Sequence, residues 1–174
     1  KIKEDLEIKL YAQDSIEHKK QFKDAFGNHI LQVKVYNPCR DTPPFDGNLT
    51  LIKATIKTGE KSIRFSYNYP NPQMALIAFE PEEITLKKIN NKTYIFIPFY
   101  LCGNEETFDK NVSYIIFYEN KHYFLEIPYY CKSETQCKPK EDINLTLNEL
   151  PTELKSIFIS YLNKKHRYRS SFKE

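Results

Sequence analysis

Four cysteines are the residues of this chain whose chemistry is easiest to predict: Cys39, Cys102, Cys131 and Cys137. An even number of cysteines in a small chain permits two disulfides, whereas a zinc site needs closer cysteine pairs or neighbouring histidines. We therefore expect disulfides and no metal site. The short, flexible segment between Cys131 and Cys137 favours a bridge between them, with Cys39–Cys102 as the second bridge. The crossed pairings, Cys102–Cys131 in particular, stay open at this point.

Four sequons of the N-x-[ST] type add a second extracellular signal, at Asn48, Asn91, Asn111 and Asn144. The Asn, Ser and Thr content of the chain gives roughly 1.4 such sites by chance, so four is a mild excess. Disulfides and N-glycans are both made in the secretory pathway. Together they predict a secreted or cell-surface, disulfide-bonded glycoprotein.

Other chemistries find little support in the sequence. The four glycines stand singly, so no phosphate-cradling loop and no nucleotide cofactor are expected. No serine is flanked by glycines, as it is on a nucleophile elbow. The acidic residues Glu82, Glu83, Glu105, Glu106 and Glu126 are candidates for the paired carboxylates of a glycoside hydrolase, but each is more typical of a surface charge. We therefore expect a protein without enzymatic activity or cofactor.

Charge and hydropathy exclude two further classes of partner. The net charge of +3 and the isoelectric point near 8.5 are too mild to indicate a nucleic-acid-binding protein. The basic residues are 22 Lys against 4 Arg, which argues against bidentate phosphate recognition. No apolar run approaches the roughly 20 residues that a membrane-spanning helix needs. We therefore expect neither a nucleic-acid partner nor a membrane span.

The elements that must position these residues are mostly strands. Residues 1–10 alternate between apolar and charged side chains, which is typical of a half-buried strand. Residues 14–26 fit either a short helix or the first strand of a hairpin that turns at Gly27-Asn28, and we favour the hairpin. Further strands are predicted at 29–36, 49–57, 61–67, 74–79, 84–89, 112–118 and 142–147.

Two segments of the middle region, 91–102 and 120–131, resemble each other. Each runs from an Asn-Lys turn through a strand of aromatic and aliphatic residues to Ile-Pro, two aromatics and a cysteine. Either a duplicated unit or convergence explains this, and convergence is favoured because a repeat array needs at least three copies. Each proline predicts that its strand lies at a sheet edge or bulges there, because proline cannot donate to the ladder.

The C-terminal part contains the one predicted α-helix, at about 152–164. Its apolar residues recur at helical spacing and form one stripe. The basic tail 164–173 after it could meet an anionic membrane, a heparin-like glycan or nucleic acid, but a solvated segment whose cations favour the helix C-terminus is the simpler interpretation. We predict an all-β, antiparallel β-sandwich of Ig-like or jelly-roll-like type over 1–150, with the helix and tail at 151–174 packed on it or trailing it.

The leading functional hypothesis is an extracellular binding or adhesion module for a protein or glycan. Its proposed contact surface is the aromatic set Phe99, Tyr100, Tyr129 and Tyr130, because tyrosines are enriched at interface hot spots. Ordinary core filling is the competing explanation for each of these residues. Glycans on Asn91 and Asn111 are expected to shield the opposite end of the sandwich.

Two alternative functions stay open. In the first, the chain is a subunit of an extracellular assembly or filament, and residues 1–12 add a strand to a neighbour's sheet. In the second, an apolar ligand is carried between the two sheets, as the abundance of aromatic residues permits.

Overall fold

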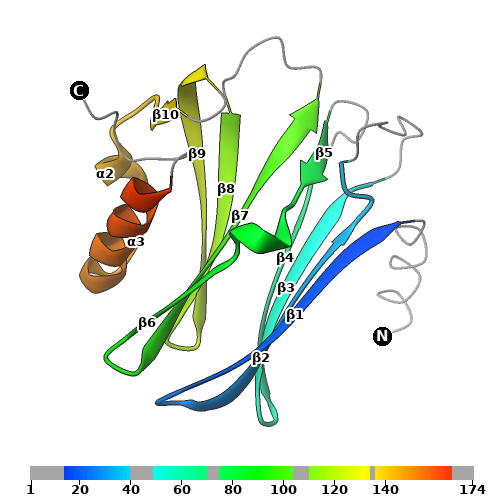
Figure 1. Ribbon diagram of the computed structural model, residues 1–174, viewed down its shortest axis with the longest axis vertical. Helices are drawn as coiled ribbons and strands as arrows, with labels where there is room; N and C mark the ends of the chain where they lie inside the picture. Colours follow the sequence, from blue (N-terminus) through cyan, green and yellow to red (C-terminus); the bar gives the residue numbers. More distant parts are fainter. Residues whose placement is uncertain (1–13, 40–48, 70–74, 104–109, 134–135, 166–174) are drawn as a thin grey trace.

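A computed structural model describes residues 14–39, 49–69, 75–103, 110–133 and 136–165 of the chain. These residues form two antiparallel sheets and a layer of helices beside the second sheet (Figure 1). The four-stranded sheet consists of β1 (Ser15–Asp24), β2 (Gly27–Tyr36), β3 (Leu51–Thr58) and β4 (Lys61–Asn68). The six-stranded sheet consists of β5 (Ala75–Ala78), β6 (Thr85–Ile89), β7 (Lys92–Gly103), β8 (Lys110–Tyr118), β9 (Lys121–Ser133) and β10 (Gln136–Pro139). The helical segments are η1 (Pro81–Glu83), α2 (Ile143–Thr146) and α3 (Thr152–Lys164).

This arrangement confirms the predicted β-sandwich with a C-terminal helix. Each sheet uses consecutive strands: the first has the order β1-β2-β3-β4, and the second has the order β10-β9-β8-β7-β5, with β6 also paired to β7. Ig-like and jelly-roll sandwiches instead have Greek-key connections between strands. The described strands therefore form two meanders packed face to face. None of the described helices has both the length and the apolar character needed to cross a bilayer.

The β1–β2 hairpin confirms the favoured reading of residues 14–26, with one correction. Asp24 pairs directly with Gly27, so the two-residue turn is Ala25-Phe26 rather than Gly27-Asn28. The backbone N–H of Phe26 donates to the carboxylate of Asp24 at 2.8 Å, which stabilises the turn. Gly27 follows with φ of +123°, a conformation that residues with a side chain rarely adopt.

The two similar segments both form hairpins with the same kind of turn. Asn90-Asn91 connects β6 to β7, and Glu119-Asn120 connects β8 to β9. All four residues have positive φ, between 46° and 61°, as type I′ turns require. The shared sequence pattern thus encodes two hairpins that lie side by side in one sheet.

Each proline of these hairpins lies at a position where its strand is paired with a neighbouring strand on only one side. Pro98 pairs with β8, but on its other side it falls between the residues of β7 that pair with β6 and those that pair with β5. Pro128 also pairs with β8, and it lies one residue before the segment of β9 that pairs with β10. Each strand is therefore locally an edge at its proline, as expected for a residue without an N–H.

The six-stranded sheet is buried on both faces, which explains its nearly continuous apolar strands. On β7, Ile95, Ile97 and Phe99 face the four-stranded sheet, where they meet apolar residues of β2 and β3. The alternate residues Tyr94 and Phe96 face the helices. The molecule therefore has two cores, one between the sheets and one beneath α2 and α3.

Helix α3 has the predicted bounds and is held by both packing and hydrogen bonds. Its residues Leu154 and Phe158 are fully buried against the six-stranded sheet. The carboxylate of Glu153 accepts hydrogen bonds at 2.7 Å from the hydroxyls of Tyr94 and Tyr118 on β7 and β8. These two bonds hold the pKa of Glu153 below its ordinary value, and burial, together with the bond to Glu153, raises the pKa of both tyrosines.

The strand expected at 142–147 is a short helix instead. Asp142 caps α2 by accepting a hydrogen bond from the backbone N–H of Asn144 at 2.9 Å. Ile143 and Leu147 lie four residues apart and are both buried in the core beneath the helices. This helical spacing of two apolar anchors outweighs the alternation that predicted a strand.

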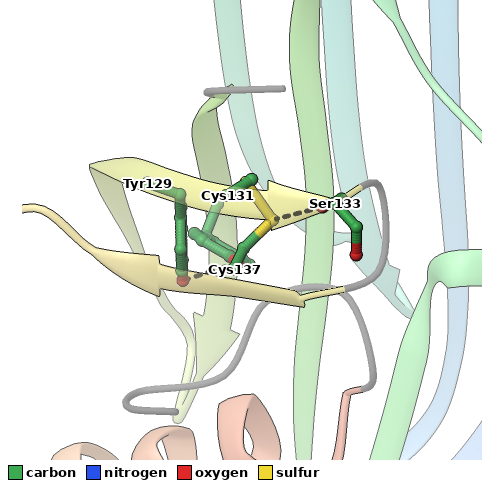
Figure 2. The surroundings of a disulfide bond; sticks show 5 residues. Tyr129, Cys131, Ser133 and Cys137 are labelled. Atoms are coloured by element: carbon green, nitrogen blue, oxygen red, sulfur yellow. Dashed lines mark hydrogen bonds between the residues drawn. A yellow bond between two sulfur atoms is a disulfide. The ribbon is translucent and has the colours of Figure 1, made fainter. Parts of the chain in front are cut away.

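Both expected disulfides are present. Cys131–Cys137 joins β9 to β10 with its Cα atoms 4.0 Å apart (Figure 2). Cys39–Cys102 connects the segment after β2 to β7 and therefore links the two sheets. The backbone N–H of Cys39 also donates to the carbonyl of Ile77 on β5 at 2.8 Å. The bridge and this hydrogen bond close the same end of the sandwich.

Candidate functional site

The outward face of the four-stranded sheet is the broad sheet surface that no described element covers. Its inward face supplies Leu31, Val33 and Ile56 to the core between the sheets. Because side chains alternate along a strand, the residues between these positions point to solvent. The other sheet has no such face, since it packs against this sheet on one side and against α2 and α3 on the other (Figure 1).

Strand pairing arranges the outward residues in four mostly polar rows that run across the sheet, followed by a fifth row, Ser15, Tyr36, Leu51 and Asn68, in which Tyr36 and Leu51 are buried. Each row is read directly from the register of β1 with β2, β2 with β3 and β3 with β4. Beginning at the end with the β1–β2 turn, the four mostly polar rows are Lys23 and Asn28, then Gln21, Ile30, Lys57 and Ser62, then Lys19, Gln32, Thr55 and Arg64, then Glu17, Lys34, Lys53 and Ser66. We call these residues the basic face.

Positive charge dominates the basic face, which carries six cations and one acid. Since the whole chain has a net charge of only +3, charge is concentrated here. Glu17 accepts hydrogen bonds from Lys19 at 3.0 Å and Gln32 at 2.6 Å, which keep its pKa below the ordinary value. The charge of Glu17 is therefore already compensated by neighbouring side chains of the same face.

Two lysines of the basic face oppose each other directly. Lys34 on β2 pairs with Lys53 on β3, so two like charges occupy neighbouring positions about 4.8 Å apart across the strands. Like charges placed opposite each other destabilise a sheet. Lys34 is held over the ring of Tyr36, with its nitrogen 4.8 Å from the ring centre, which offsets part of this repulsion. An anion bound between the two lysines would remove the rest.

A hollow of about 670 Å³ lies at the turn end of the basic face. Its lining includes the outward residues Gln21, Lys23, Asn28, Ile30 and Lys57, which come from the first two rows. Ile30 is 42% exposed, so an apolar side chain is open to solvent in this hollow. The hollow thus combines two cations, two amides and one apolar side chain, and its volume is within the range of ligand sites.

Beneath this hollow, a buried histidine connects three strands. His29 contacts the Oδ1 of Asp24 through Nε2 and the Oγ1 of Thr58 through Nδ1, each at 2.6 Å. The ring of Phe22 stacks on His29 at 4.6 Å. Burial opposes the charged form of Asp24, but hydrogen bonds from His29, Phe26 and Thr93 outweigh it and lower the pKa.

Thr58, His29 and Asp24 follow the order hydroxyl, imidazole and carboxylate, which is that of a catalytic triad. A catalytic role would require a substrate to reach the Thr58 hydroxyl. Because the ionised Asp24 can only accept, Nε2 of His29 donates to it, and Nδ1 shares a hydrogen bond with the Thr58 hydroxyl, which can either donate or accept. Thr58 is not one of the described residues that line the hollow or the neighbouring pocket between the sheets. The three groups therefore satisfy one another inside the fold and support the hollow from below.

The pocket between the sheets, beside Asp24 and His29, has a volume of about 30 Å³. This is the space of about one water molecule. An apolar ligand carried between the sheets does not fit there. Within the described part of the chain, no three His, Cys, Asp or Glu side chains come together as metal ligands.

The four aromatic residues predicted to form a contact surface are not brought together. Phe99 is 1% exposed in the core between the sheets, where it meets the rings of Tyr67 and Phe124. Tyr129 is fully buried in the other core. Tyr100 is half-buried beneath the ammonium group of Lys110, and Tyr130 is 48% exposed. Core filling thus accounts for Phe99 and Tyr129.

The three described sequons are all exposed, but they do not shield one end of the sandwich. Asn91 lies in the β6–β7 turn, whereas Asn111 pairs with Pro128 close to the Cys131–Cys137 bridge. The expectation that both would cover the turn end is therefore wrong. Because β8 runs antiparallel to β7, its first residues return to the end where β7 stops. Asn144 lies on α2, and none of the three lies on the basic face.

Other predicted features lie outside the described residues. They are the sequon at Asn48, the strand of residues 1–12, the carboxylates Glu105 and Glu106, and the basic tail beyond Lys165. Of the remaining carboxylates, Glu126 is on β9, while Glu82 and Glu83 form η1 ahead of β6. Strands β8 and β7 separate Glu126 from Glu82 and Glu83.

Sequence reasoning missed the basic face, although part of its signal is in the sequence. Lys19, Gln21 and Lys23 alternate along β1, and Lys53, Thr55 and Lys57 alternate along β3. Comparison of the chain with family models, curated proteins and solved structures finds no match.

Proposed function

We propose that this protein is a secreted or cell-surface binding module that holds an acidic extracellular partner against its basic face. The observation that carries the proposal is the charge of this face, six cations against one acid on a sheet face that no described element covers. A surface of one charge sign attracts partners of the opposite sign and speeds their association.

The extracellular part of the proposal is supported by the two disulfides and by the exposed sequons. Disulfides persist in oxidising compartments and are rare in the cytosol. Asn91, Asn111 and Asn144 are all accessible for glycosylation. Since none of the three lies on β1–β4, glycans there would leave the basic face open to a partner.

The test compares the binding of labelled protein to cell surfaces before and after charge reversal on the basic face. The variant Lys53→Glu/Lys57→Glu changes the net charge by four units. It is not expected to unfold the protein, because Lys53→Glu converts the like-charge pair with Lys34 into an opposite-charge pair. We expect it to lose most cell-surface binding.

A matched control is Lys87→Glu/Lys121→Glu, which changes the net charge equally on the six-stranded sheet. We expect it to retain binding, and circular dichroism melting curves should show that both variants fold. Equal losses in both variants would show that net charge alone acts, and equal binding of wild type and the basic-face variant would refute the proposal.

A further inference from the structure

We propose that the acidic partner is a linear sulfated glycan, and that the hollow at the turn end holds one of its sugar units. This inference rests on the proposed function, because it names the partner of the same face. It draws on three independent features of the basic face: the spacing of its cations, the type of its side chains and the composition of the hollow.

The spacing suits an extended polyanion. Cations occur in each of the four rows, from Lys23 in the first to Lys34 and Lys53 in the fourth. Rows are two residues apart along a strand, so this distance is about 20 Å, and the four strands span about 14 Å. A chain that carries a negative group on every unit can contact successive rows, whereas a single small anion would use one row.

The side-chain types favour sulfated sugar over nucleic acid. Five of the six cations are lysines, which bind anionic groups as point charges without the fork that arginine offers to phosphate. The four rows contain no aromatic residue, and Tyr36 in the next row is buried, so bases would find no exposed stacking platform among these residues. Amide and hydroxyl groups stand between the lysines instead and can bond sugar hydroxyls; they are Gln21, Asn28, Gln32, Thr55 and Ser62.

The hollow has the composition of a sugar subsite. The exposed side chain of Ile30 offers an apolar patch for the C–H face of a pyranose ring. Lys23 and Lys57 lie in adjacent rows beside it, where each can contact a sulfate group. Gln21 and Asn28 complete the lining with neutral donors and acceptors. The stacked Phe22 and His29 beneath the hollow keep the backbone of β1 and β2 in place.

The experiment measures the affinity of the full chain for immobilised heparin over a range of salt concentrations. Completely desulfated heparin, poly-L-glutamate, duplex DNA and phosphatidylserine vesicles serve as the other probes. We expect tight binding to heparin, weak binding to desulfated heparin, and a linear fall of log K with log salt concentration. Lys23→Ala/Lys57→Ala should reduce the salt slope by about one unit for each lysine removed.

The neutral residues of the hollow give a second readout. Gln21→Ala/Asn28→Ala should weaken heparin binding by about fivefold for each hydrogen bond lost, with no change of salt slope, because neutral groups release no ions. Gln136→Ala/Asn148→Ala removes two exposed amides away from the basic face, and as the matched control it should bind as wild type does. Unchanged affinity of the Gln21/Asn28 variant would overturn the hollow as a sugar subsite.

The probes separate failure of this inference from failure of the proposed function. If poly-L-glutamate, DNA or vesicles bind through the basic face better than heparin does, the sulfated glycan is overturned while the acidic-partner function stands. Equal binding of native and desulfated heparin would also overturn the sulfated glycan and leave the acidic-partner function standing. If Lys53→Glu/Lys57→Glu changes binding to none of the probes, both proposals fall.

Discussion

The two disulfides should contribute very different amounts to stability. The contribution of each bridge can be measured by reducing it, with its two cysteines kept in place. Two single-bridge variants are needed: Cys131→Ala/Cys137→Ala, which keeps the bridge between the sheets, and Cys39→Ala/Cys102→Ala, which keeps the β9–β10 bridge. In each variant, the free energy of unfolding is compared between the oxidised and the reduced protein. The same side chains are present in both states, so the difference reports the bridge alone.

The magnitude follows from the length of chain that each bridge closes. The sequence separation is 63 for Cys39–Cys102 and 6 for Cys131–Cys137. In the chain-entropy model these loops correspond to stabilisations of about 4.3 and about 2.2 kcal/mol at 25 °C. The hydrogen bond from Cys39 to Ile77 already holds the cross-sheet end in the folded state. The bridge should therefore act mainly on the unfolded chain.

Urea unfolding followed by far-UV circular dichroism is the suitable assay, because the chain contains no tryptophan. With a urea dependence of about 2 kcal/mol/M, reduction should lower the midpoint by about 2 M for the bridge between the sheets and by about 1 M for the other. If a reduced protein is unfolded in buffer, titration with trimethylamine N-oxide recovers the folded state and the same difference.

Equal losses in the two variants, or a larger loss for the short loop, would refute this reasoning. Either result would mean that native-state contacts at the bridges, rather than loop closure in the unfolded chain, determine their contribution. An unchanged urea dependence on reduction of Cys39–Cys102 would point the same way, because release of the long loop should expand the unfolded state.

Three further predictions concern the helix layer and the sequons. Phe158→Ala empties a fully buried site beneath α3 and should lower the free energy of unfolding by about 3–5 kcal/mol in urea, and a loss below about 1 kcal/mol would show that α3 contributes little to the core. The pKa of Glu153 is lowered in the folded state, so its stabilising contribution is present above the ordinary pKa of 4.5 and is lost as the pH falls through the lowered value. The melting temperature of Glu153→Gln should therefore fall less than that of wild type between about pH 6 and about pH 3, and parallel curves would contradict this. In a secreting cell line, Asn→Gln at Asn91, Asn111 or Asn144 should each remove the mass of one glycan by mass spectrometry, and an unchanged mass would show that the site is unoccupied.

Some features of the fold follow from local sequence and needed no tertiary information. The spacing of apolar residues predicted the bounds of α3 as they occur, because a helix is specified by a pattern within a few turns. Alternation predicted most strands, and turn-forming asparagines marked the two type I′ hairpins. Loop length selected the disulfide pairing, since cysteines close in sequence meet most easily.

Other features depend on which segments pack together. The run of aromatic and aliphatic residues that predicted β7 could not show that both its faces are buried, because the cover over Tyr94 and Phe96 comes from α3, about sixty residues away. Tyr129, which lies in the core beneath the helices, was assigned to a surface for this reason, whereas Phe99 was assigned there because its cover comes from the four-stranded sheet. The position of Asn111 also required the pairing of β8 with β7 and β9, since strand direction decides at which end a residue lies.

The basic face shows this division most clearly. Period two determines which side chains of a strand share a face, so the alternating lysines of β1 and β3 are visible in the sequence. Only the register between strands places Lys34 opposite Lys53 and Lys57 beside Ile30. Only the packing of the second sheet decides which of the two faces is left to solvent. Local patterns therefore determined the strands, while long-range pairing and burial created the candidate site.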